Sequence, residues 1–197
     1  MLSSIHPLGE RGRHNRFGVT AGAHVVGSAV GGALVGLTAG SIGSLVSLAL
    51  DPAEERLAVI AVAAVLLATA LDGTGVSVPS TRRQVDERWL GRYRGTVYGA
   101  GYGFQLGAGI ATVVTTWSVP LWIVLAGVTT SPAAGGVIGA CFGLARGAAI
   151  LLVGNVRTPE RLRSFHRSLA DRGSVVRVGS LVTQAGVGLA AIALLAA

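Results

Sequence analysis

The stretch FGVTAGAHVVGSAVGGALVG, residues 17–36, opens with a pattern that the chain uses again. Phe17-Gly18-x-x-x-Gly22-x-His24 returns as Tyr98-Gly99-x-x-x-Gly103-x-Gln105. A weaker third copy, Gln184-Ala185-Gly186-Val187-Gly188, repeats the pattern of residues 105–109. Apolar runs and arginine-rich stretches separate the copies, so the repeating unit is predicted to be a pair of membrane helices.

The composition excludes an ordinary soluble domain. Of the 197 residues, 51% are hydrophobic and 13% are charged, and the mean hydropathy is +0.63. Soluble domains carry about 25% charged residues. Thirty glycines point the same way, because small residues let membrane helices approach closely. The length fits one domain, so residues 1–197 are expected to form a single transmembrane domain.

The net charge of +7 comes from arginines that lie mainly between apolar segments. This is the positive-inside pattern of membrane proteins, so the lipid bilayer is the expected partner and nucleic acid is not. The single cysteine, Cys141, excludes an intramolecular disulfide and a CxxC pair. The polar stretch 1–16 has no short apolar region followed by a cleavage site, so no removable signal peptide is expected.

A membrane helix needs about 20 apolar residues, and five segments come near that length. They run from Phe17 to about Thr38, Leu57 to Leu71, Thr96 to about Trp117, Ala133 to Val153 and Val175 to Ala196. The predicted fold class is therefore all-α: a polytopic membrane helix bundle of about five spans, built from a repeated helical hairpin.

Arginines give the expected orientation. They precede the first span and fill the loops after the second and the fourth, whereas the other two loops are acidic or uncharged. The N-terminal tail, residues 1–16, is therefore predicted to be cytoplasmic, with the C-terminus outside a bacterial plasma membrane. A six-span alternative would place one arginine-rich loop outside.

Two apolar segments, Ser41–Leu50 and Val119–Thr130, are too short to span. Each could extend the preceding helix, lie at the outer interface or re-enter the membrane. Pro120 favours a break in the second case. A re-entrant segment would bear on function, because such backbone is tolerated only when it is buried in protein or lines a cavity.

Residues 78–94 and 158–172 are predicted to form cytoplasmic arginine-rich amphipathic helices. In the second, Thr158 fits an N-cap and Pro159 the first helical position. Leu162, Phe165 and Leu169 share one face, with arginines around them. Both segments are expected to rest on anionic headgroups, and a docking surface for a soluble partner is the alternative.

Glycine ridges mark the third and fourth spans. Glycine recurs every fourth residue at 95, 99, 103 and 107, and again at 135, 139, 143 and 147. Such ridges predict backbone contact between helices. The alternative is that some of these glycines leave room for a solute path.

Four polar side chains are predicted to share one depth in the bundle: His24, Gln105, Gln184 and Arg146. Histidine can carry a proton near neutral pH, and glutamine offers both a donor and an acceptor. The layer could bind a small oxyanion or couple a solute to a proton. The alternative is hydrogen bonding that merely joins helices.

Arg146 lies inside the fourth span, where a charge is costly without water, a partner or the interface. Its alternatives are snorkelling to the interface, an ion pair with Asp72, and an anion or substrate site. The predicted substrate-binding residues are thus His24, Gln105, Arg146, Gln184 and Asp72.

Catalysis has little support, and the chain is predicted not to be an enzyme. It contains no Walker motif, no nucleophile elbow, no HExxH and no paired intramembrane carboxylates. Neither a metal nor a cofactor is expected. Haem bound through His24 is the weakest hypothesis, because one intramembrane histidine supplies a single ligand.

The stretch 98–112, followed by 139–147, resembles small uncharacterised integral membrane proteins of actinobacteria. More distantly, it resembles the superfamily of cytochrome c biogenesis (DsbD-type) thiol carriers and sulfite-exporter-like membrane transporters. The resemblance implies a small bundle of duplicated helical units that moves reducing equivalents or small solutes. The thiol carriers use two cysteines, one in each repeat near a proline, and this chain lacks them, so a thiol relay is disfavoured.

Two functions follow. The first is an integral membrane transporter or channel for a small solute, for instance an anion. The second is a non-catalytic membrane subunit that assembles with or stabilises a larger membrane complex. A homo-oligomer is also open, because glycine ridges serve contacts within and between chains equally well.

Overall fold

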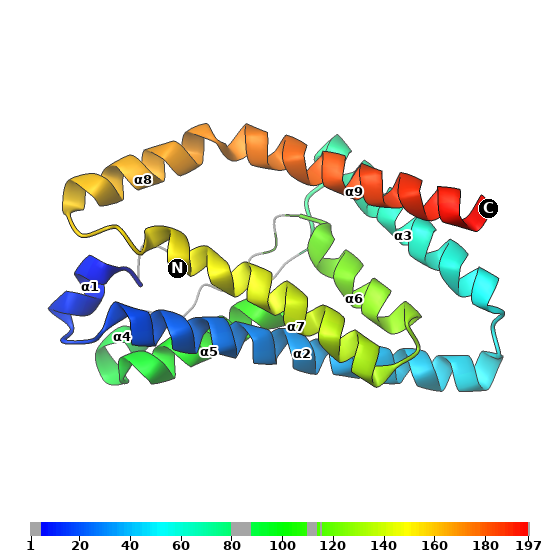
Figure 1. Cartoon of the computed structure of the whole chain (residues 1–197), viewed down its shortest axis with the longest axis horizontal. Coiled ribbons are helices and arrows are strands. Elements are labelled where there is room, and N and C mark those ends of the chain that lie inside the picture. Colours follow the sequence, from blue (N-terminus) through cyan, green and yellow to red (C-terminus); the bar gives the residue numbers. More distant parts are fainter. Residues whose placement is uncertain (1–4, 80–87, 110–113, 115, 197) are drawn as a thin grey trace.

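The computed structural model describes residues 5–79, 88–109, 114 and 116–196, and every element within them is a helix (Figure 1). The elements are α1 (Pro7–Gly12), α2 (Phe17–Leu50), α3 (Glu54–Thr74), α4 (Trp89–Arg92), α5 (Gly95–Ala108), α6 (Ser118–Val128), α7 (Pro132–Ala148), the 3-10 helix η1 (Ala149–Val153), α8 (Pro159–Asp171) and α9 (Gly173–Ala196). The predicted all-α class is confirmed for this part of the chain.

The first long helix, α2, is longer than predicted. It has 34 residues and no proline, so at 1.5 Å per residue it extends for about 51 Å. It ends where Asp51 takes a left-handed conformation with φ 42° and Pro52 follows. Of the three alternatives for Ser41–Leu50, the structure therefore has the helix extension.

Helix α5 runs parallel to α2 and lies against its N-terminal half. A Cβ atom at Gly99 would lie 2.6 Å from the carbonyl oxygen of Thr20. One turn on, Gly103 meets the carbonyl of His24 in the same way. The residue numbers of α2 and α5 rise together along the contact, so the two helices run in the same direction. The two helices that carry the first two copies of the repeat thus lie side by side.

Helix α7 packs antiparallel on α2. Gly32 meets the Gly139 carbonyl and Gly36 meets the Gly135 carbonyl. The residue numbers of α7 therefore fall as those of α2 rise. At these positions a Cβ atom would overlap backbone, and backbone cannot rotate away as a side chain can. The ridges are therefore filled by helix packing, as predicted from small residues, and the alternative of a solute path along them is wrong.

Ser28 joins the three helices at the centre. Its carbonyl oxygen faces Gly107 of α5 and Gly143 of α7, where no side chain would fit. Its hydroxyl donates to the Gly143 carbonyl at 2.7 Å, and the residue is fully buried. Contacts of this kind bring Cα–H groups against carbonyl oxygens, which adds a weak attraction to close packing.

Helix α5 ends early, at Ala108, because Gly109 takes a left-handed conformation with φ 71°. The predicted third span, Thr96 to about Trp117, is therefore wrong at its C-terminal end. At 14 residues, α5 is shorter than the roughly 20 that a spanning helix needs. The predicted segment Val119–Thr130 largely forms a helix of its own, α6, which approaches α2 where Gly43 meets the Gly127 carbonyl.

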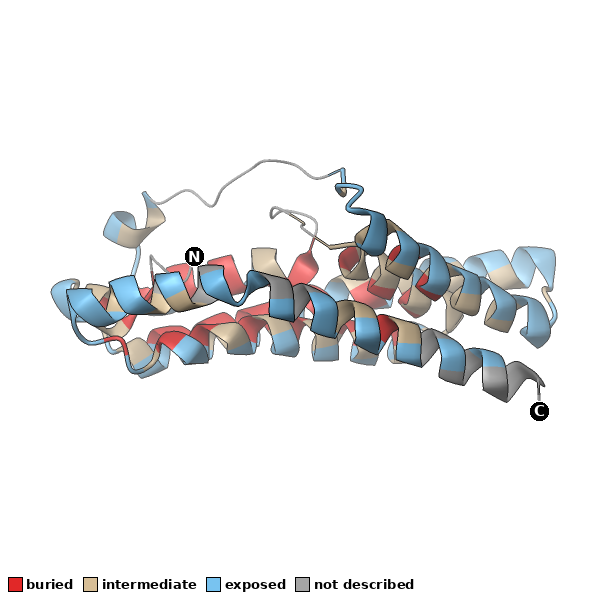
Figure 2. Ribbon diagram, turned by 90° about the horizontal axis from the view of Figure 1, so that it is seen from above, coloured by how far each residue is buried: buried red, intermediate tan, exposed pale blue. Residues whose placement is uncertain are grey.

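Three of the described helices are long and apolar enough to cross a membrane: Phe17–Leu50, Glu54–Thr74 and Pro132–Val153. Their outer faces are exposed, and buried residues follow the inner faces (Figure 2). This is consistent with a membrane protein. The remaining span, Val175 to Ala196, lies within α9, and its membrane role stays a prediction.

The arginine-rich elements α1, α4 and α8 gather at one end of the molecule (Figure 1). Helix α8 confirms the expected helix at its start: Thr158 Oγ1 accepts from the N–H of Arg161 at 3.3 Å. Leu162 and Phe165 pack against the buried cluster around Tyr98 and Val153. Leu162 and Phe165 of the predicted apolar face of α8 thus pack inside the protein, and the side chain of Leu169 lies outside what the structure describes. Of the first predicted amphipathic helix, residues 80–87 lie outside the described residues, and α4 is a short helix in its second half.

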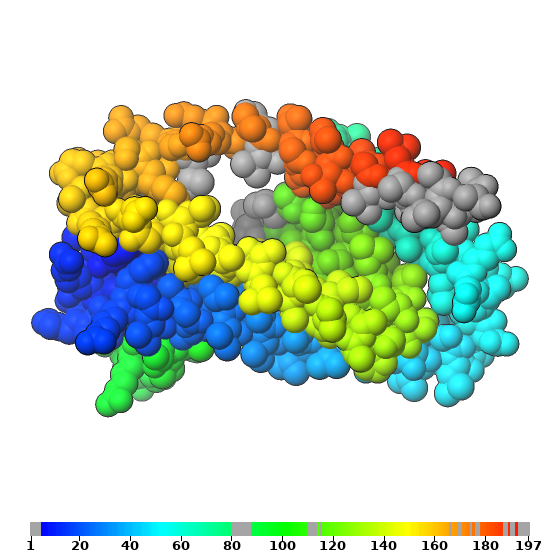
Figure 3. Space-filling model, in the orientation of Figure 1, coloured from blue at the N-terminus to red at the C-terminus, as the bar shows by residue number. Residues whose placement is uncertain are grey.

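In the space-filling view, α8 and α9 run along one edge of the molecule and α2 along the opposite edge (Figure 3). Helix α2 packs most extensively against α7 and α5, whereas α9 packs mainly against α3. The molecule therefore has a glycine-packed core of α2, α5 and α7, with α3 and α9 placed beside it.

Glycine substitutions on α2 test this packing. Gly32→Ala is expected to destabilise the protein by about 1–3 kcal/mol, because the new methyl group forces α2 from α7. Gly22→Ala is the matched control, since nothing lies within 4 Å of its Cβ position. The control should be neutral or slightly stabilising, because alanine favours helix more than glycine. Thermal unfolding in detergent measures both, and equal stabilities would contradict the packing.

Candidate functional site

A half-buried polar cluster joins α3, α6 and α9. Asp72, in the last turn of α3, accepts the backbone N–H of Trp117 at 2.8 Å and the amide of Gln184 at 3.2 Å. The Gln184 amide nitrogen also bonds to the hydroxyl of Ser118. Trp117 caps α6, so the carboxylate lies at the positive end of that helix dipole. Three helices therefore contribute to one hydrogen-bonded group.

Gln184 has its amide orientation fixed by these contacts. An ionised carboxylate only accepts hydrogen bonds, so the Gln184 nitrogen faces Asp72. The Gln184 oxygen, Oε1, is buried and has no hydrogen-bond partner in the described part of the chain. The residue is only 8% exposed. An acceptor of this kind costs roughly 1–3 kcal/mol when it is left without a donor.

A cavity of about 450 Å³ borders this cluster and is called here the Gln184 cavity. It lies between α3, α6 and α9 and is lined by Val65, Ser118, Leu121, Leu125, Gly179, Ser180, Thr183 and Gln184. Small-molecule sites typically have about 300–1,000 Å³, mostly apolar walls and a few polar groups. The Gln184 cavity has these properties.

Arg146 contacts the end of a neighbouring helix, whereas one predicted role was to bind an anion or substrate. Its guanidinium donates to the Leu106 carbonyl at 3.0 Å and lies 5.5 Å from the centre of the Phe142 ring. Leu106 belongs to the last turn of α5, and its carbonyl also accepts the backbone N–H of Gly109 at 3.3 Å. A cation there also opposes the negative end of the helix dipole. Arg146 thus caps α5, the helix that ends at Ala108.

The predicted polar layer is divided by the structure. His24 of α2 is buried and its backbone carbonyl faces Gly103 of α5, whereas its Nδ1 has no hydrogen-bond partner among the described residues. Gln105 is half-buried and makes no side-chain hydrogen bond in that part of the chain. The structure brings together Asp72 and Gln184 and places Arg146 and His24 against α5. The predicted ion pair would require a contact between Arg146 and Asp72. Within the described residues, Arg146 instead bonds to the Leu106 carbonyl.

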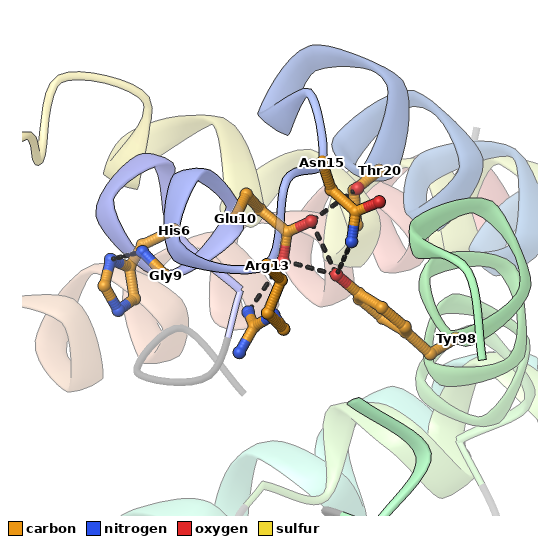
Figure 4. A network of polar contacts seen from close by, with 7 residues as sticks. All are labelled: His6, Gly9, Glu10, Arg13, Asn15, Thr20 and Tyr98. Carbon is orange, nitrogen blue, oxygen red and sulfur yellow. Dashed lines mark hydrogen bonds and ion pairs between the residues drawn. The ribbon is translucent and has the colours of Figure 1, made fainter. Parts of the chain in front are cut away.

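A second polar cluster lies at the arginine-rich end of the molecule (Figure 4). It was not predicted from the sequence. Glu10 of α1 is fully buried. Its carboxylate accepts the hydroxyls of Tyr98 at 2.6 Å and Thr20 at 2.8 Å, and pairs with Arg13 at 2.7 Å. Asn15 also donates to the Tyr98 hydroxyl, at 3.2 Å. We call these five residues the Glu10 cluster.

The Glu10 cluster ties α1 to the first turns of α2 and α5. Burial by itself lowers the pKa of the Arg13 guanidinium, but its hydrogen bonds with Glu10 and Tyr98 raise that pKa above its usual value. The predicted N-terminal tail is therefore a docked element with a buried ion pair. One signal was available: Glu10 is the only acidic residue among the first 50, next to several arginines.

No family model, curated protein or solved structure matches the chain. The resemblance to thiol carriers and sulfite-exporter-like transporters stays a prediction.

Replacing Arg146 tests its capping role. Arg146→Met is expected to destabilise the protein by about 1.5–3 kcal/mol, because the Leu106 carbonyl loses a charged donor. Arg146→Lys should retain part of the stability, since it keeps the positive charge. Unfolding in detergent measures both. A Met variant as stable as the original protein would contradict this role.

Removing one hydroxyl tests the Glu10 cluster. Tyr98→Phe is expected to cost about 1.5–3 kcal/mol, because the buried carboxylate loses a donor. Tyr93→Phe serves as the control, since Tyr93 is 43% exposed. The melting temperatures of the two variants are compared with that of the original protein. Equal losses in both variants would show that the hydroxyl of Tyr98 has no special role.

Proposed function

We propose that this protein is a membrane transporter for a small solute and that the solute binds in the Gln184 cavity. One observation carries the proposal: the buried, orientation-fixed amide of Gln184, whose oxygen has no partner among the described residues, belongs to a side chain that lines a cavity of about 450 Å³. The three apolar helices support the membrane part of the proposal.

The helix ends around the cavity also support a solute site. Asp72 lies near the C-terminal end of α3, and Trp117 caps the start of α6. Helices that begin or end inside the bundle are a common way for transporters to present polar groups to a substrate. The solute would pass between α3, α6 and α9, because these are the helices that line the Gln184 cavity.

The packing suggests which part would move. Backbone contacts along α2 hold α5 and α7 closely, and a small displacement there would lose many contacts at once. Helix α3 packs mainly on α9 and α6, and the Gln184 cavity lies between these three helices. We therefore expect α3 and α9 to shift against the core during transport. The proposed membrane is a bacterial plasma membrane, with the arginine-rich end in the cytoplasm.

The alternative function is a non-catalytic membrane subunit of a larger complex. The end of α2 favours it, because Leu45, Leu48 and Leu50 are 67%, 85% and 73% exposed. A partner subunit could cover these side chains, and so could lipid. Purification in mild detergent separates the functions, because stoichiometric partner polypeptides would support the subunit.

Substitution of Gln184 tests the transport proposal. The protein is placed in liposomes loaded with a mixture of small metabolites, and the solutes released are identified by mass spectrometry. Gln184→Leu is expected to abolish release of the transported solute, because the cavity loses its polar end. Gln105→Leu is the matched control and should leave release unchanged. The proposal would be refuted if the original protein released no more solute than loaded liposomes without protein. It would also be refuted if the original protein and both variants released the solute equally.

A further inference from the structure

The Gln184 cavity is lined by uncharged side chains. Among the described residues that border it, none is ionisable. The carboxylate of Asp72 is not part of the lining, and its two oxygens accept from the Gln184 amide and from the backbone N–H of Trp117. A charged ligand would therefore lose hydration in the cavity without meeting a charged partner in its lining, which is costly.

Three hydroxyl groups in the lining offer both kinds of hydrogen bond. Ser118 Oγ accepts from the Gln184 amide, so the Ser118 hydroxyl keeps its own proton to donate. Thr183 donates to the Gly179 carbonyl at 2.9 Å, so its oxygen accepts a further bond. The hydroxyl of Ser180 can do either. These three serine and threonine residues are half-buried or exposed. A ligand group that both donates and accepts, such as a hydroxyl, matches them, whereas an ammonium only donates and a carboxylate only accepts.

The rest of the wall is apolar and continues outward. Val65 of α3 and Leu121 and Leu125 of α6 line the cavity. On the α9 side, the lining residue Thr183 is exposed and its neighbour Val182 is 66% exposed, so the cavity opens beside an apolar surface. With α9 in the membrane, this opening faces lipid tails. The volume of about 450 Å³ holds about 15 groups of the size of a water molecule, at roughly 30 Å³ each, which is enough for a short hydrocarbon chain.

From this arrangement we infer that the Gln184 cavity selects an uncharged amphiphile with one hydroxyl head and a short hydrocarbon chain, such as a medium-chain alcohol. This substrate class rests on the proposed function, and it differs from the anion that the sequence suggested. The head bonds to the hydroxyls of Ser118, Ser180 and Thr183. The chain lies against Leu121 and Leu125, and the molecule enters from the bilayer.

The test is photolabelling of the full-length protein in nanodiscs with 3-azioctanol, an octanol that carries a diazirine. Mass spectrometry of peptides locates the label, which is expected on α6 and α9 at the cavity lining. Octan-1-ol should block the labelling at a membrane concentration at least about tenfold lower than octylammonium or octanoate does, because each charged head loses hydration and one kind of hydrogen bond. Partitioning into empty nanodiscs gives the membrane concentration of each compound.

Variants locate the binding. Leu125→Trp is expected to abolish the labelling, because the larger side chain fills the cavity. Val124→Trp is the matched control and should leave labelling unchanged, since Val124 is 43% exposed and does not line the cavity. Ser180→Ala combined with Thr183→Val should weaken the block by octan-1-ol at least about tenfold, because the head loses two hydrogen bonds. Melting curves identify variants that fail to fold, and competition in the original protein decides without them.

Three results would overturn the inference: an equal block by the three octyl compounds, labelling only outside the cavity lining, or labelling that is the same in Leu125→Trp and Val124→Trp. A selective block by octan-1-ol, without any release from loaded liposomes that depends on Gln184, would uphold the inference and refute transport. Gln184-dependent release of a charged solute, without a selective block by octan-1-ol, would uphold transport and refute the inference.

Discussion

Close backbone contact around Ser28 is the constraint on which the rest of the structure depends. The carbonyl of this residue faces Gly107 of α5 and Gly143 of α7, and its hydroxyl bonds to the Gly143 carbonyl. Lipid tails are as apolar as leucine, so membrane helices gain little from hydrophobic burial against each other and rely on close packing and hydrogen bonds. Glycine at these positions allows three backbones to meet, and this fixes how α5 and α7 lie along α2.

The fixed core determines where charge can be placed. Helix α5 lies along α2 and ends at Ala108, just before Gly109. Arg146 of α7 faces that end and donates to the Leu106 carbonyl. At the other end of the same helices, Glu10 receives the hydroxyls of Thr20 and Tyr98 and pairs with Arg13. Arg146 and the Glu10–Arg13 pair therefore both serve the core.

Much of the fold was predictable from particular residues. The glycine ridges at 99–107 and 135–147 predicted close packing, and the structure has it. Thr158 and Pro159 predicted the start of α8. The end of α5 was not predicted, because the apolar pattern continues past Gly109 and a single glycine inside such a pattern does not by itself end a helix. The docking of α1 was also missed, because a short polar stretch before a span resembles a solvated tail.

By itself, the sequence determined the helical class, the small-residue faces and the clustering of arginines, because these depend on spacing along one helix. Only the tertiary structure decided which partner each polar side chain takes. Arg146 bonds to a residue 40 positions away, Tyr98 to one 88 positions away and Gln184 to one 112 positions away. Equal depth in a membrane leaves rotation about each helix axis open. That rotation is fixed when glycine faces meet, and it decides which side chains share a site.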